Sequence, residues 1–84
     1  MKGIVVECPI CKKKRVYSSV ESEGSAWTAW ERAALGLSIH VKMSHNQSWS
    51  LRECKEYVNR TAKEIDLPDE EIKRLEELRW VKEL

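Results

Sequence analysis

The chain has 84 residues, of which 42% are hydrophobic, so it fits one small domain with a thin core that often needs a metal, disulfides or a partner subunit for stability. Fifteen Lys and Arg residues against fourteen Asp and Glu residues give a formal net charge of +1. This balance excludes the strongly basic field of a histone-like or non-specific DNA coat protein.

The cysteine count and the hydropathy pattern indicate a compartment. Three cysteines are an odd number, which favours metal ligation in a reducing environment over a secreted disulfide framework. No apolar run has the length of a membrane span, and the apolar part of the N-terminal segment is too short for a secretory signal. We expect a soluble intracellular protein, cytoplasmic or associated with the nucleoid or nucleus, that contacts no membrane.

The N-terminal segment predicts a β-hairpin. Residues 4–6 are β-branched and residues 15–20 form a second strand candidate, with a Cys-Pro-Ile-Cys turn and three lysines between them. Residues 21–25 end this strand. Thr28 and Glu31 then have the spacing of a capping box, so a helix should begin near residue 28.

The first helix is predicted to run from about residue 29 to about residue 44. Gly36 is its weak point, because glycine inside a helix costs about 1 kcal/mol relative to alanine. Either another backbone approaches Gly36 closely, or two short helices meet near it; we expect one helix. The prediction rests on apolar residues at helical spacing, namely Trp27, Trp30, Ala34, Leu37 and Val41.

Two further helices are predicted in the second half of the chain. The first begins after Ser50, which forms a capping box with Glu53, and ends at Asp66. The second begins at Pro68 and continues to the C-terminus. The expected fold class is α+β and rich in helix: a single domain, residues 1–84, with a ββα unit in residues 1–46 and a two-helix extension in residues 47–84. The apolar face of the first of these helices comprises Leu51, Cys54, Val58, Ala62 and Ile65.

Two cysteines and two histidines have the spacing of a zinc site. Cys8 and Cys11 are separated by two residues on a predicted turn, and His40 and His45 by four residues near the end of a predicted helix. Such pairs can bring two thiolates and two imidazoles to one tetrahedral Zn²⁺. We expect one structural zinc ion, which would stabilise the first half of the chain.

At these residues the chain resembles the zinc fingers with two cysteines and two histidines. Residues 37–45 match the helix pattern of that family, with a leucine three positions before the first histidine, and the resemblance covers about residues 4–46. It implies a ββα unit, Leu37 in the core and Trp27 or Trp30 in place of the usual aromatic residue. The chain departs from the family in having 28 residues between the second cysteine and first histidine, where fingers usually have about twelve. The implied ligands are Cys8, Cys11, His40 and His45.

The cysteines also allow other interpretations. The Cys-Pro-Ile-Cys segment looks like the active site of a thioredoxin or glutaredoxin, although the residues after it are basic and strand-like, and the chain is too short for the βαβ arrangement. Unligated thiols are the third possibility. Four protein ligands close a zinc site, and no glutamate adjoins His40 as in a zinc protease, so we expect no catalysis and no small-molecule substrate. Cys54 is expected to be a buried, inert thiol, with a reactive thiol or replacement ligand as the alternative.

Nucleic acid is the partner that the cationic residues favour. The helix positions that read bases in the resembled fingers carry no hydrogen-bonding side chain here, and we expect a later helix to cover that face. Four consecutive cations follow the cysteines and suit backbone phosphates, with a solvated turn as the alternative. The base-reading positions are Ala33, Leu35, Gly36 and Ile39, and the cations are Lys12, Lys13, Lys14 and Arg15.

The last helix is expected to carry a second apolar face, formed by Trp80, Val81 and Leu84, opposite that of Ile72, Leu75 and Leu78. This face predicts a protein or homodimer interface; its alternative is packing against the hairpin, with Trp80 closing the core. The sequence therefore predicts a small regulatory or adaptor protein associated with nucleic acid, of the DNA-binding or transcription-regulation type. A protein interaction module without nucleic acid is the alternative, and a dithiol oxidoreductase is a weaker one.

Overall fold

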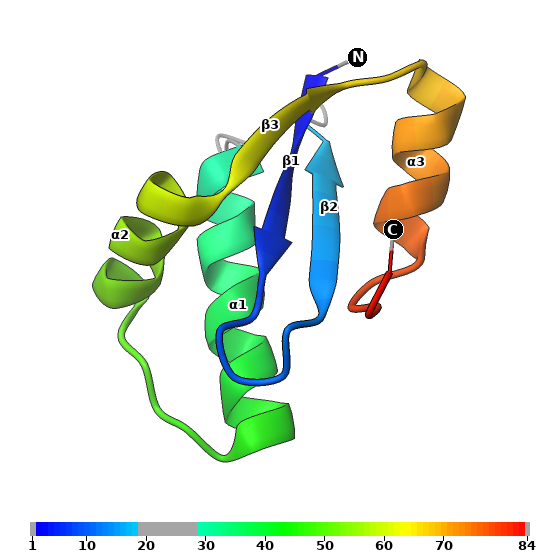
Figure 1. Cartoon of the computed structure of the whole chain (residues 1–84). Coiled ribbons are helices and arrows are strands. Elements are labelled where there is room, and N and C mark those ends of the chain that lie inside the picture. Colours follow the sequence, from blue (N-terminus) through cyan, green and yellow to red (C-terminus); the bar gives the residue numbers. More distant parts are fainter. Residues whose placement is uncertain (1, 19–28, 84) are drawn as a thin grey trace.

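The computed structural model describes residues 2–18 and 29–83 (Figure 1). Three strands form one antiparallel sheet in the order β2-β1-β3, and three helices surround it, so the α+β class with a ββα unit and additional helices is confirmed. Residues 19–28 and Leu84 lie outside the described residues, and with them the predicted strand end, the capping threonine and Trp27. The elements are β1 (Lys2–Glu7), β2 (Lys14–Ser18), α1 (Ala29–His45), α2 (Leu51–Thr61), β3 (Lys63–Asp66) and α3 (Asp69–Glu77).

The main core lies between the β1-β2 hairpin and helix α1. Ile4 pairs with Tyr17 across the two strands, and alternation along β1 places Val6 on the same face of the sheet. In Figure 1, α1 passes behind the lower end of β1 and the turn that leads to β2, and α2 packs beside α1. The buried side of α1 includes Ala33, Leu37 and Val41, all fully buried. This packing fixes the end of α1 against the turn between β1 and β2.

Helix α1 is continuous through Gly36, as expected, and its bounds of Ala29–His45 agree with the prediction. The neighbour that approaches Gly36 is the ring of Tyr17 and not another backbone. A Cβ built at position 36 would lie 2.9 Å from the Cζ atom of Tyr17 and closer still to its hydroxyl. Glycine is therefore required here by a side chain from β2.

The prediction that the second helix extends to Asp66 is wrong. Helix α2 begins after its Ser50 cap, as predicted, but ends at Thr61, and Lys63–Asp66 form strand β3. Strand β3 pairs with β1 in antiparallel register, with Gly3 opposite Ile65. The physical reason is the free edge of β1, whose backbone groups find partners in β3 that a longer helix could not provide.

The last helix also ends earlier than predicted. Helix α3 stops at Glu77, and Arg79 has a left-handed backbone with φ of 59° that turns the chain back. Val81 then exchanges two backbone hydrogen bonds with Lys14 at the start of β2, 2.6 and 2.9 Å long. Trp80 packs half-buried against the main core, so the C-terminal residues do not form a second face of α3.

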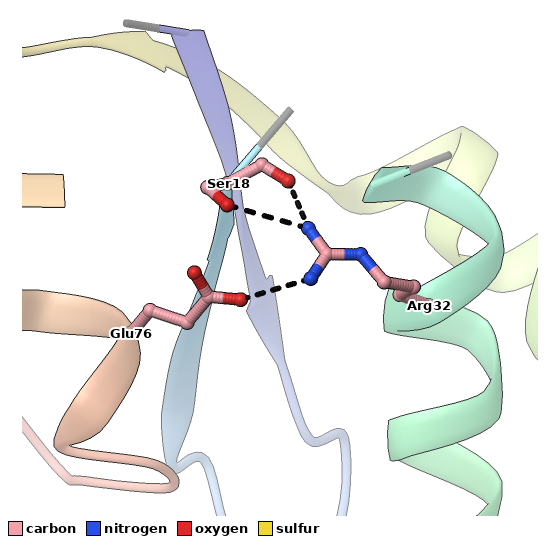
Figure 2. Close-up of polar contacts among 3 residues, drawn as sticks. All are labelled: Ser18, Arg32 and Glu76. Atoms are coloured by element: carbon pink, nitrogen blue, oxygen red, sulfur yellow. Dashed lines mark hydrogen bonds and ion pairs between the residues drawn. The ribbon is translucent and has the colours of Figure 1, made fainter. Parts of the chain in front are cut away.

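Helix α3 lies beside β2, where Ile72 is fully buried and reaches Gly3. An ion pair ties this helix to α1 around the end of β2, as Figure 2 shows. Arg32 pairs with Glu76 at 3.1 Å and donates a hydrogen bond to the backbone oxygen of Ser18. None of the helices in residues 2–18 and 29–83 has the length and apolar character that crossing a membrane requires.

Candidate metal centre

Two cysteines and two histidines from distant parts of the chain converge beside the turn of the hairpin. Cys8 follows β1 directly and Cys11 lies in the turn before β2, whereas His40 and His45 lie in the last turns of α1. The Sγ atom of Cys8 is 3.6 Å from Nε2 of His45, and Sγ of Cys11 is 3.4 Å from Nε2 of His40. One donor atom from each of the four residues lies within 4.8 Å of every other.

The turn that carries the cysteines is held by its own backbone. The amide of Cys8 donates to the carbonyl of Lys13 at 2.8 Å, and the amide of Lys12 donates to the carbonyl of Cys8 at 2.9 Å. Lys12 has a positive φ of 64°, which closes the turn so that the chain can enter β2. The two sulfur atoms are thereby presented on one side of a rigid segment, which we call the knuckle (residues 8–15).

Two of the donor separations match the edge of a tetrahedral zinc site. Zn²⁺ bonds of about 2.3 Å to sulfur and about 2.0 to 2.1 Å to nitrogen imply a sulfur-to-nitrogen edge of roughly 3.5 Å in a tetrahedron. The two Cys-to-His distances of 3.6 and 3.4 Å lie on either side of this value. Two thiols and two imidazoles are also a ligand set typical of structural zinc. The four side chains could therefore hold one metal ion with little rearrangement.

Burial affects the protonation of two of these residues. It raises the pKa of the fully buried Cys8 thiol, against an opposing effect of backbone amides in the knuckle. It also lowers the pKa of His40, and positive charge on His45, Lys13 and Arg15 lowers it further. The lowered pKa favours the neutral imidazole of His40, which is the form that binds a metal, while the Cys8 thiol would lose its proton when a cation compensates the charge.

A tryptophan that was not predicted to belong to the site packs against one of its histidines. The indole of Trp80 stacks on the imidazole of His40, with ring centroids 4.3 Å apart and planes 23° apart. The rings of His40 and His45 also contact each other, with nearly perpendicular planes and centroids 5.1 Å apart. His40 is only 9% exposed. Trp80 is evident in the sequence as a large aromatic residue, but no local pattern predicts the turn at Arg79 that places its indole against His40.

The cations of the knuckle lie next to the metal centre but differ in exposure. Lys12 is exposed, whereas Lys13, Lys14 and Arg15 are half-buried. Arg15 lies over the ring of Tyr17, 4.8 Å from its centroid, which gives this residue a packing role. Within residues 2–18 and 29–83, no carboxylate lies at ion-pair distance from the three lysines. Three positive charges beside the metal centre are therefore left for solvent or a ligand.

The remaining predicted site residues have separate positions. Cys54 is fully buried in the main core, and it is not part of the metal-ligand cluster. The expectation that a later helix covers the base-reading face of α1 is wrong in part, because Ala33 is buried but Leu35 is 39% and Ile39 is 53% exposed. Helix α2 packs on another side of α1, so this apolar face stays open to solvent.

Comparison with protein-family models, with curated proteins and with solved structures gives no match to this chain. The metal centre and its surroundings are therefore interpreted from their own geometry.

Proposed function

We propose that the protein is a non-catalytic domain, stabilised by one zinc ion, that contacts the phosphate backbone of nucleic acid through Lys12, Lys13 and Lys14. The observation that supports it most is the position of these lysines. They lie on a segment that two candidate metal ligands and two backbone hydrogen bonds hold in place, and no carboxylate of the described residues forms an ion pair with them, although Glu7 lies opposite Lys14 in the sheet. Cations fixed in this way release counterions when they meet phosphates.

The donor set supports a structural role for the ion. Four protein ligands satisfy tetrahedral zinc and leave no position for a water molecule or substrate. The same closure argues against a dithiol oxidoreductase, because Cys8 is fully buried and a redox cysteine must be reached by its partner thiol. We expect native mass spectrometry to find one zinc ion in each chain and a chelator to lower the unfolding temperature strongly.

The contact with nucleic acid is expected to be independent of base sequence. Side chains at the base-reading positions of α1 offer no hydrogen bond to a base edge, so only phosphates are recognised. Binding of a fluorescent DNA duplex should weaken with salt. If all three lysines contact phosphates, the slope of log K against log salt concentration should be about −2.7.

The test compares two triple variants with equal changes of charge. Changing Lys12, Lys13 and Lys14 to Glu should abolish binding at low salt while the zinc content stays at one ion per chain. The control changes three exposed cations of other elements to Glu, and it should bind far better than the first variant. If both variants bind equally, the knuckle is not the contact site. The control residues are Lys55, Arg60 and Lys73.

One observation favours a second function, that of a protein interaction module. Leu35, Ile39 and Met43 lie four residues apart on α1 and are 39%, 53% and 80% exposed, so they form an apolar stripe along the helix. An absence of DNA binding even at low salt, together with dimers that dissociate in Ile39→Glu, would support this function instead. Of the three residues predicted as an interface, Trp80 contacts the main core, Val81 forms backbone hydrogen bonds with Lys14, and Leu84 lies outside the described residues.

A further inference from the structure

We infer that the C-terminal segment, residues 78–83, is a strap over the metal centre, and that Trp80 is a positioning residue for the ligand His40. This inference rests on the proposed zinc site. It adds a specific consequence, which is that metal binding and docking of the C-terminal segment strengthen each other.

The strap has two points of attachment, and both belong to the metal-binding unit. Trp80 stacks on His40, and Val81 exchanges two backbone hydrogen bonds with Lys14, the residue of the knuckle at which β2 begins. In Figure 1 the C-terminal segment forms a loop below α3 that passes near the start of β2 and then turns back toward α3. The left-handed backbone of Arg79 makes this reversal possible directly after the helix.

The stacking determines the orientation of the His40 imidazole ring. A ring plane that lies nearly parallel to an indole 4.3 Å away has lost most of its freedom to rotate about the side-chain bonds. In this orientation Nε2 of His40 lies 3.4 Å from the sulfur of Cys11. Trp80 also covers one face of the imidazole, which is only 9% exposed, so water reaches this ligand poorly. Residues that orient a metal ligand through a hydrogen bond typically alter metal affinity 10- to 100-fold when they are changed. We expect the stacked indole, which also restricts the ligand ring, to act at the lower end of this range.

The coupling should operate in both directions. One stacked pair with two hydrogen bonds is a weak attachment by itself. A bound ion would fix the imidazole of His40 and the knuckle, which includes Lys14, and so would hold both attachment points in place. By thermodynamic linkage, a docked strap must then increase the affinity for the metal by the same factor.

The test measures the transfer of zinc from the loaded protein to a coloured chelator. Trp80→Ala should release zinc at least about 10-fold faster than the wild type, and Trp80→Phe should restore most of the difference because it retains a ring on His40. Leu78→Ala is the matched control, since Leu78 belongs to the same segment but is 45% exposed, and its release rate should not change. Equal release rates in Trp80→Ala and the wild type would overturn the inference.

A second variant covers the case in which Trp80→Ala does not fold. Val81→Pro keeps the indole but removes the amide that donates to Lys14, so it should also accelerate zinc release. In the opposite direction, hydrogen exchange at the amides of Lys14 and Val81 in the wild type should become slower when zinc is added, and this slowing should be smaller in Trp80→Ala. If the wild type binds no zinc, the proposed function itself fails; if it binds zinc and neither variant changes release, only the strap fails.

Discussion

The hydroxyl group of Tyr17 occupies the space that a side chain at position 36 would need. Tyr17 is 4% exposed and its ring cannot swing away from α1, because it lies within the main core. A methyl group at position 36 must therefore displace the ring or the helix. Gly36→Ala should gain about 1 kcal/mol of helix propensity but lose about 1 to 3 kcal/mol through overpacking, for a net loss of stability.

Chemical denaturation of the zinc-loaded protein would measure this change. The control is Ala34→Gly, which removes a methyl group from a buried position of the same helix and should destabilise without any clash. A double variant, Gly36→Ala with Tyr17→Phe, should recover part of the loss, because the hydroxyl is the nearest atom to the new methyl group. Strict additivity of the two changes would contradict direct contact between these positions.

A second prediction concerns the hydroxyl of Tyr17 itself. Its oxygen is buried and has no hydrogen-bond partner in the part of the chain that the structure describes. Removing an unpaired buried hydroxyl should relieve its desolvation cost. We expect Tyr17→Phe to leave the free energy of unfolding unchanged or to raise it by about 1 kcal/mol.

Because of Tyr17, we also expect the stability of the fold to decrease at alkaline pH. Burial raises the pKa of Tyr17 above its ordinary value, with a further contribution from the charge of Glu76 that Arg15 and Arg32 oppose. The folded chain thus retains a proton that the unfolded chain releases, so stability should fall as the pH rises above about 10. Tyr17→Phe should lose less stability in this range than the wild type. Identical alkaline profiles would show that Tyr17 ionises equally in both states.

A third prediction concerns the ion pair between Arg32 and Glu76, which joins α1 to α3. The two side chains are 32% and 25% exposed, so solvent screens the pair only in part. Arg32 also donates to the carbonyl of Ser18 (Figure 2). Arg32→Met should therefore cost about 1 to 2 kcal/mol, and Glu76→Gln should cost less, because the hydrogen bond to β2 survives.

A second ion pair in the chain provides the control for this comparison. Arg52 and Glu56 are 3.6 Å apart on α2, with side chains 90% and 68% exposed. An exposed pair of this type contributes at most about 0.5 kcal/mol, so Arg52→Met should hardly change the denaturation midpoint. If Arg32→Met and Arg52→Met had the same effect, the bridge between α1 and α3 would not stabilise the fold.

The metal ligands and the first helix were predictable because their signals are local. The spacing of Cys8 and Cys11, and of His40 and His45, limits which side chains can meet on a turn and on a helix end. The four donors converge even though 28 residues separate Cys11 from His40. Helix α1 supplies the last part of this interval, residues 29–39, and carries both histidines toward its far end.

The parts that were predicted wrongly depend on tertiary contacts. Ala62 and Ile65 continue the apolar spacing of α2, so no local pattern distinguishes a longer helix from a strand there. The free edge of β1 decides in favour of β3. In the same way, Trp80 fits a helix face by its spacing, but the core and the imidazole of His40 offer it better contacts than solvent does.

The last prediction separates the third cysteine from the metal centre. Cys54 is fully buried, and burial raises the pKa of its thiol, with a smaller effect of the charge on Glu53. A protonated, inaccessible thiol neither binds zinc nor reacts readily. Cys54→Ala should therefore retain one zinc ion per chain and lose about 1 to 2 kcal/mol of stability from the core. Cys54→Ser should lose more stability, because it buries a hydroxyl among apolar neighbours.

By contrast, Cys11→Ser should lose the zinc ion, as measured by native mass spectrometry, because it removes one of the four donors. Loss of zinc in Cys54→Ala would mean that the donor set of the centre has been assigned incorrectly.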